Sequence, residues 1–322
     1  MKDWLPKCCE ALIVNKMKAD ILGARNKYQI GGIPNHRVEE HLIVVKAIIE
    51  RSIAKGEGSI VILADIEKFL DSESLRGVMN TLHMAEIHKK CYRTWFNLNK
   101  RTVISVKTPS GTTKSKETHE IVAQGSGGAA LASQADIGRG FSDYFGRSTY
   151  EAGYGCVKIQ PQSYQDNVLR VAPCISSARA GNVLFSRMFR ERLLNCHPTK
   201  TCYVLFGKEK WKQDVREELK RSPLMFGDFE MKEKQQDIYL GDALSGKGLA
   251  ASVEETINQR LGRVKGLIYE VAAIMKDYRM QAMGGMQVAW EIWERSLVPA
   301  LLANCGSWVG INKTALKALN ST

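Results

Sequence analysis

No stretch of this sequence stays apolar over the roughly 20 residues that a membrane-spanning helix requires. A signal peptide is missing too, because Lys7, Glu10 and Lys16 interrupt the apolar core that such a peptide needs. Internal repeats and low-complexity tracts are absent as well. We therefore expect an intracellular protein that is neither secreted nor embedded in a membrane, with its compartment, nuclear or cytoplasmic, left open.

Cysteine spacing gives no sign of a disulfide framework or a zinc site. The eight cysteines include no Cys-x-x-Cys pair, and His197 beside Cys196 lacks the remaining spacing of zinc ligands. We expect reduced, mostly buried thiols.

Negative charge is scarce relative to positive charge. Lys and Arg number 46 against 34 acidic residues, which gives a net charge of +12 and a pI near 9.3. This balance allows a polyanionic partner, but it fits an ordinary basic protein equally well. Five cations could follow a phosphate backbone, although each alone is more readily a solvated surface charge. They are Arg37, Lys46, Lys107, Lys114 and Lys116.

Apolar periodicity predicts a mixed α+β protein, and 44% hydrophobic residues suffice for a core. Helices are expected at about 1–24, 38–53, 72–82, 92–98, 129–145, 176–194, 208–220, 250–280 and 284–303. Strands are expected at about 59–64, 102–107, 119–123, 155–159, 168–171 and 201–206, with short β segments near Phe229 and Tyr239.

Two aspartates stand where strands end. Asp65 closes the apolar strand 59–64, and Asp166 lies in a polar turn before the strand 168–171. If these strands are neighbours in one sheet, the two carboxylates meet. Paired carboxylates suit nucleotidyl transfer, which uses two divalent cations about 3.5 to 4 Å apart. A strand-terminal aspartate taken alone is more often a cap or a turn residue.

Five segments in a fixed order carry a family resemblance. They are Ala64–Ser72 (ADIEKFLDS), Gln124–Gly128 (QGSGG), Tyr164–Asn167 (YQDN), Leu194–Gly207 (LNCHPTKTCYVLFG) and Tyr239–Gly241 (YLG). Each is weak alone, but their order and spacing resemble reverse transcriptases of the non-LTR retrotransposon type. The resemblance spans most of the chain.

This resemblance implies a polymerase palm, with an antiparallel sheet packed on helices, partial fingers and a helical, thumb-like C-terminal region. The implied boundaries are residual fingers at 1–58, the palm at 59–246 with an inserted hairpin at about 102–123, and the thumb or connection region at 247–322. The implied activity is RNA-directed DNA polymerisation, with an RNA template, a DNA primer and deoxynucleoside triphosphates as partners.

The resemblance also implies site residues and a cofactor. Two Mg²⁺ ions, for which Mn²⁺ can substitute, would be held by Asp65, Asp166 and the peptide oxygen of Ile66. Lys200 matches a candidate general acid for pyrophosphate. The substrate-binding positions are Tyr164, Gln124, Gly125, Ser126 and Ile66, and the primer grip is Tyr239, Leu240 and Gly241. For Asp71 we favour a cap or acceptor of the helix beginning near Ser72 over metal binding.

Two departures from the family pattern bear on activity. Asn167 stands where the family has a second aspartate, which removes a charge from the cation site. The segment Gln29–Gly32 already resembles a late part of the fingers, so the fingers look truncated relative to the family pattern. Three functions therefore stay open: a polymerase, a non-catalytic nucleic-acid-binding remnant, and an unrelated interaction protein in which the motif order is coincidence.

Overall fold

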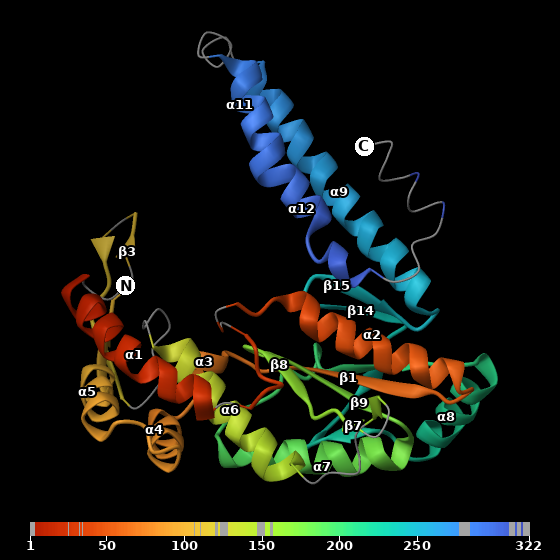
Figure 1. Cartoon of the computed structure of the whole chain (residues 1–322), viewed down its shortest axis with the longest axis horizontal. Coiled ribbons are helices and arrows are strands. Elements are labelled where there is room, and N and C mark those ends of the chain that lie inside the picture. Colours follow the sequence, from red (N-terminus) through yellow and green to blue (C-terminus); the bar gives the residue numbers. More distant parts are fainter. Residues whose placement is uncertain are drawn as a thin grey trace.

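A computed structural model places a central sheet between two helical layers, with a helical arm rising from one end (Figure 1). The structure describes residues 4–24, 26–31, 33, 35–105, 107–109, 111–119, 122, 128–146, 152–154, 157–276, 284–308, 313 and 317. None of the helices among these residues is long and apolar enough to cross a membrane.

The central sheet has five strands in the order β13-β10-β1-β9-β8. Their bounds are Lys232–Glu233 (β13), Cys202–Phe206 (β10), Ser59–Asp65 (β1), Asn167–Ala172 (β9) and Gln162–Tyr164 (β8). All pairings are antiparallel except that of β10 with β13. The predicted α+β fold with a mainly antiparallel sheet packed on helices is confirmed, and we refer to this sheet and its covering helices as the palm.

The central strand β1 is apolar on both faces because helices cover both. Ile60 and Ile62 point into the core cluster of the lower layer, whereas Val61 and Leu63 point into that of the upper layer. Alternate strand residues face opposite sides of a sheet, so a strand buried on both sides reads as one apolar run.

The two layers are built from different helices. Helices α6 (Ala129–Phe145), α7 (Ile175–Glu191) and α8 (Glu209–Arg221) lie on the lower face, where a cluster of phenylalanines fills the core. Helix α2 (Val38–Ala54) covers the upper face (Figure 1). The strands β11 (Met225–Phe226) and β12 (Phe229–Glu230) form a short antiparallel hairpin.

A separate helical unit lies beside the palm (Figure 1). It comprises α1 (Trp4–Ala24), α3 (Phe69–Ser72), α4 (Leu75–Met84) and α5 (Lys89–Asn99), with α6 running into it. Trp95 anchors it, because its buried indole Nε1 donates to Glu10 Oε1 at 2.7 Å. Ser72 does not cap a helix as predicted: it lies within α3, and Ser74 caps α4 by accepting from the Gly77 amide.

The predicted hairpin of the helical unit is present with shifted bounds. Its outer ladder pairs β2 (Arg101–Ile104) with β5 (Lys116–His119), and its inner ladder pairs β3 (Lys107–Thr108) with β4 (Gly111–Thr112). The second strand thus begins at 116 rather than 119.

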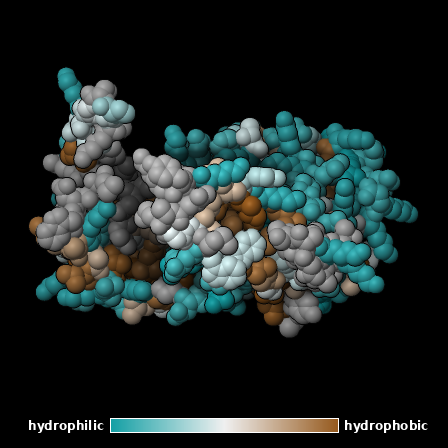
Figure 2. All heavy atoms as spheres, turned by 90° about the horizontal axis from the view of Figure 1, so that it is seen from above, coloured by the Kyte–Doolittle hydropathy of each residue, from teal (hydrophilic) through white to brown (hydrophobic). Residues whose placement is uncertain are grey.

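The arm is formed by α9 (Leu249–Met275) packed against α11 (Gly285–Ile292), a π-helical turn (Trp293–Leu297) and α12 (Val298–Leu302). Its core contains Val253, Ile257 and Leu301. On the face seen from above, the coloured atoms are mainly hydrophilic, and hydrophobic residues gather in smaller patches (Figure 2). The hairpin β14 (Gln236–Tyr239) and β15 (Asp242–Ser245) joins the arm to the palm.

Three further expectations are wrong. The strand before the Asp166 turn is β8 rather than 155–159, because β7 (Val157–Lys158) pairs instead with β6 (Gly153–Tyr154). Lys46 cannot follow a phosphate backbone, since it is buried on Asp242. Most described cysteines are not buried, although all are free thiols.

Candidate functional site

Asp65 and Asp166 come together at the end of the two central strands. Strand register pairs Asp65 with Asn167, and the Ile66 amide donates to the Asp166 carbonyl oxygen at 3.0 Å. The expectation that these two strands are neighbours is confirmed. Both side chains are partly buried.

The Asp166 turn is braced by a segment that the sequence did not connect with it. Gln29 forms a bridge with Ser163, and its Nε2 donates to the Ser163 hydroxyl at 2.9 Å. A Cβ added to Gly31 would lie 2.6 Å from the Gln165 backbone nitrogen, so only glycine fits there. Gln165 itself has a positive φ of 57°. The segment that resembled late fingers therefore holds the turn in place.

A second loop positions the chain after Asp65. The His197 amide donates to the Asp65 carbonyl at 2.9 Å, and the Glu67 amide donates to the Asn195 carbonyl at 2.8 Å. This pairing brings the loop containing Lys200 to the acids. The Lys200 ammonium lies 3.1 Å from Asp65 Oδ2, with its side chain largely exposed.

Neighbouring side chains already offset part of the negative charge of Asp65 and Asp166. Asp65 Oδ2 accepts a hydrogen bond from the Lys200 ammonium. Asp166 Oδ1 accepts one from the side-chain Nδ2 of Asn167 at 3.0 Å. Burial, and to a lesser degree the negative charge of Asp65, raises the pKa of Asp166, while Lys200 opposes this shift. The site thus carries less free negative charge than two isolated carboxylates would.

The oxygen ligands at this site are of the kind that binds a hard cation, but they are few. Carboxylate and peptide oxygens are the ligands that Mg²⁺ prefers, and Asp65 and Asp166 can supply them. Within the described part of the chain, no three acidic, histidine or cysteine side chains converge as a metal site. Asp65, Asp166 and the Ile66 peptide oxygen are the described groups that would hold such a cation.

Small pockets open on both sides of the acid pair. One, of about 140 Å³, is lined by Asp65, Asn167, Lys200 and Tyr239 among others. The other, of about 230 Å³, is lined by Lys68, Phe69, Leu70, Ala130, Gln134, Gln165 and Asp166. The predicted primer-grip tyrosine therefore lies beside the acids, and Tyr164 ends the strand that leads to Asp166.

The turn at Leu240 and Gly241 is fixed by the arm. Both residues have positive φ angles, 51° and 85°. The Leu240 carbonyl accepts from Asn304 Nδ2 at 2.9 Å, and the Gly241 carbonyl accepts from Arg260 Nη2 at 3.1 Å. The arm and the acid site are thus connected through one short turn. The predicted Gln124, Gly125 and Ser126 lie outside the described residues.

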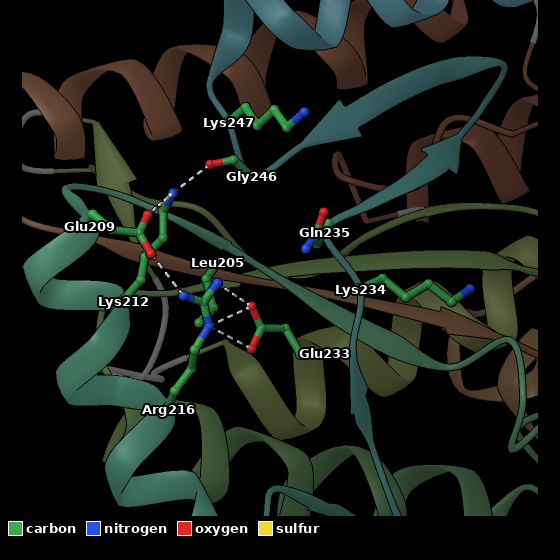
Figure 3. Close-up of a pocket in the computed structure, with 9 residues that line it drawn as sticks. All are labelled: Leu205, Glu209, Lys212, Arg216, Glu233, Lys234, Gln235, Gly246 and Lys247. Atoms are coloured by element: carbon green, nitrogen blue, oxygen red, sulfur yellow. Dashed lines mark hydrogen bonds and ion pairs between the residues drawn. The ribbon is translucent and has the colours of Figure 1, made fainter.

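A larger charged pocket, of about 510 Å³, lies between α8 and β13 (Figure 3). Arg216 donates to both carboxylate oxygens of Glu233 and also to Glu209. Lys212 donates to Glu209 and to the Gly246 carbonyl. Its charges are largely neutralised by one another, so we assign no chemistry to this pocket.

Comparisons with known proteins give the fold but no family. No family model matches the sequence, and no curated protein matches it either. The apo telomerase of Candida tropicalis is similar with a TM-score of 0.52 and 7% identity, over 74% of this chain and 39% of that one.

Two further solved structures match less well. A C. tropicalis apo telomerase truncated from its C-terminal domain gives a TM-score of 0.49 at 8% identity, over 72% of this chain and 43% of the other. A C. albicans telomerase in complex with a TWJ fragment of telomeric RNA gives 0.48 at 10% identity, over 98% and 53%. This chain therefore spans only about 39% to 53% of the telomerases it resembles. The first match places the chain among reverse-transcriptase-like palm folds, and none of the matches supports the non-LTR retrotransposon type.

Proposed function

We propose that this chain is a nucleotidyltransferase of the RNA-directed DNA polymerase kind, which extends a DNA primer on an RNA template, in keeping with the retrotransposon-like order of its motifs. The observation that carries this proposal is the meeting of Asp65, Asp166 and Lys200 at one edge of a palm sheet. The net charge of +12 suits a nucleic-acid partner.

Each site residue receives a role from its position. Asp65, Asp166 and the Ile66 carbonyl would hold Mg²⁺, which when bound activates the primer hydroxyl and offsets charge on the triphosphate. Lys200, once released from Asp65, would donate a proton to the departing pyrophosphate. Tyr164 would support the primer or template strand.

Two further segments complete the proposed site. Gln124, Gly125 and Ser126 would contact the newly formed base pair. The Tyr239–Gly241 turn would position the primer end, because it lies beside the Asp65 pocket and is held by the arm. The role of the Tyr239–Gly241 turn follows from the motif resemblance and from its placement, whereas that of Gln124, Gly125 and Ser126 follows from the resemblance alone.

Asn167 sets the expected strength of the activity. An amide oxygen binds Mg²⁺ more weakly than a carboxylate, and the Asn167 side-chain Nδ2 donates a hydrogen bond to Asp166 Oδ1. We therefore expect slow synthesis that rises when Asn167→Asp restores a third carboxylate.

A second candidate function is nucleic-acid binding without synthesis, and the contacts of Lys200 with Asp65 and of Asn167 with Asp166 favour it. If Lys200 stays on Asp65 and Asn167 stays on Asp166, the protein binds a duplex but takes no metal. Such binding would weaken steeply with salt.

The test is primer extension on an RNA template in Mg²⁺ and then Mn²⁺, using the unaltered chain, Asp166→Ala and Asn167→Asp. Asp143→Ala is the matched control, because Asp143 is an exposed acid of α6 paired only with Arg139 among the described residues. Synthesis that is lost in Asp166→Ala and kept in Asp143→Ala supports the polymerase. Salt-sensitive duplex binding with no synthesis, even by Asn167→Asp, would establish the binding protein instead.

A further inference from the structure

Two lysine–aspartate pairs line the pocket of about 140 Å³ beside the acid site. The Lys200 ammonium lies 3.1 Å from Asp65 Oδ2, and the Lys234 ammonium lies 3.1 Å from Asp237 Oδ2. The two pairs have the same separation but different acids, since only Asp65 belongs to the proposed metal site. They therefore allow a matched comparison within one pocket.

The two pairs differ in how firmly they are held. The Lys200 side chain is 60% exposed, and within the described part of the chain its ammonium donates to Asp65 alone. An exposed pair of this kind contributes little to stability, so the ammonium can leave its carboxylate readily. Lys234 is more enclosed, with 36% of its side chain exposed, and Asp237 also accepts from the Cys202 thiol at 2.9 Å. The Lys200 pair is therefore the one that opens more easily.

The Lys200 ammonium lies where a divalent cation would approach Asp65. A Mg²⁺ ion binds a carboxylate oxygen at about 2 Å, so a cation on Asp65 Oδ2 would come close enough to the ammonium for strong repulsion. Asp166 does not relieve this conflict, because its Oδ1 already accepts from Asn167 Nδ2. One of the two cations must leave the Asp65 carboxylate.

We propose that Lys200 is a built-in competitor for the metal ion, whose ammonium neutralises Asp65 and must swing away before a divalent cation binds there. This inference rests on the proposed function for the assignment of Asp65 as a metal ligand. An anion that binds the released ammonium, such as a phosphate group, keeps it from returning and so favours the metal-bound state. The Lys200–Asp65 contact thus sets the cation affinity of the acid pair.

The first test measures Mn²⁺ affinity by electron paramagnetic resonance in the full chain, without nucleotide or nucleic acid. Lys200→Met removes the charge and keeps much of the side-chain volume. It should bind Mn²⁺ about fivefold more tightly than the unaltered chain, which corresponds to about 1 kcal/mol, the upper range for an exposed ion pair. Lys234→Met removes the same charge from the same pocket, and it should change the affinity much less because Asp237 is not a proposed ligand.

A third variant tests competition in the opposite direction. Lys200→Arg keeps the charge, and a guanidinium can grip a carboxylate with two parallel hydrogen bonds. This variant should bind Mn²⁺ more weakly than the unaltered chain. A position that only supports the fold would not rank Met, Lys and Arg in this order of decreasing metal affinity.

The second test follows the Lys200 amine itself. Reductive methylation at one fixed pH is measured by mass spectrometry, with Mg²⁺ or with a chelator, and Lys234 serves as the internal reference. Mg²⁺ should raise the labelling rate of Lys200 relative to Lys234, because the released amine is more accessible to the reagent. In Asp65→Asn the Lys200 rate should be high under both conditions.

Equal Mn²⁺ affinity in the unaltered chain and Lys200→Met overturns the inference, as does an equal tightening in Lys234→Met or a Lys200 labelling rate that Mg²⁺ leaves unchanged. Primer extension is a separate outcome. Tighter Mn²⁺ binding by Lys200→Met, with no synthesis by the unaltered chain or by Asn167→Asp, would sink the proposed polymerase and leave the competition standing. Synthesis combined with a Mn²⁺ affinity that ignores residue 200 would do the reverse.

Discussion

Two aspartates of this chain each bind a cationic side chain, yet their surroundings differ completely. The partly buried carboxylate of Asp65 is paired with the largely exposed Lys200. Asp242 is fully buried and contacts Lys46, Arg260 and Ser307. A buried charge requires a complete set of partners, whereas an exposed pair can exchange its partner for water, metal or substrate. The comparison separates a site that can react from a joint that holds the arm.

The Asp242 joint unites four parts of the chain. Lys46 comes from α2, Arg260 from α9, and Ser307 from the end of the described arm, where the Lys46 ammonium also donates to the Ser307 carbonyl. Arg260 lies over the Trp308 ring with 5.3 Å to its centroid. Asp242 itself follows the Leu240–Gly241 turn, so the joint and the acid site are separated by one hairpin.

The largest expected effect comes from breaking the buried joint. Asp242→Ala leaves two buried cations uncompensated and should lower the free energy of unfolding by about 3–5 kcal/mol, measured by urea denaturation. Adding Lys46→Met should recover part of that loss. The exposed counterpart Lys200→Met should change stability by less than about 1 kcal/mol. Equal effects at the two sites would refute the contrast.

A smaller loss is expected where the loop meets the Asp166 turn. The Cβ of Gly31→Ala would collide with backbone 2.6 Å away, so we expect a loss of about 1–3 kcal/mol and weaker primer extension. Gly262→Ala is the matched control, because it meets nothing within 4 Å and lies in the interior of α9. It should stabilise the protein by about 0.5–1 kcal/mol. A harmless Gly31→Ala would mean that the loop does not brace the turn.

The smallest effect is a pH dependence from a buried carboxyl group outside the site. Burial, and then the charge of nearby Asp136, raises the pKa of Glu73 well above its ordinary value, while Ser133 and Arg192 oppose the shift. The folded protein therefore holds a proton that the unfolded chain loses above about pH 4.3. The Glu73 contribution to stability is present below that pH and is lost as the pH rises towards the raised pKa.

Glu73→Gln tests this directly. Its free energy of unfolding should fall less than that of the unaltered chain between pH 5 and the alkaline end of the folded range. Parallel pH profiles for the two proteins would show that Glu73 ionises normally.

The sequence predicted the palm well because local patterns there agree with the tertiary environment. Strand β1 reads as apolar since both faces are covered, and the meeting of Asp65 with Asp166 followed from neighbouring strands. The strand before Asp166 was misplaced, because the β6–β7 hairpin and β8 look equally extended from residue types alone.

Contacts between distant segments could not be read from the sequence. Lys46 looks like any surface cation of an amphipathic helix, and only its tertiary partner Asp242, far along the chain, explains its burial. Nor does any local pattern predict that the buried Gln134 amide makes no hydrogen bond within the described part of the chain.

The most direct test of the account is Mn²⁺ binding, followed by electron paramagnetic resonance in the unaltered chain, Asp166→Ala, Asp242→Asn and Asn167→Asp. We predict that the unaltered chain binds Mn²⁺, that Asp166→Ala abolishes this binding, that Asn167→Asp strengthens it, and that folded Asp242→Asn retains it. Binding that is unchanged in Asp166→Ala, or absent even in Asn167→Asp, would contradict the assignment of the exposed acid pair as the reactive site.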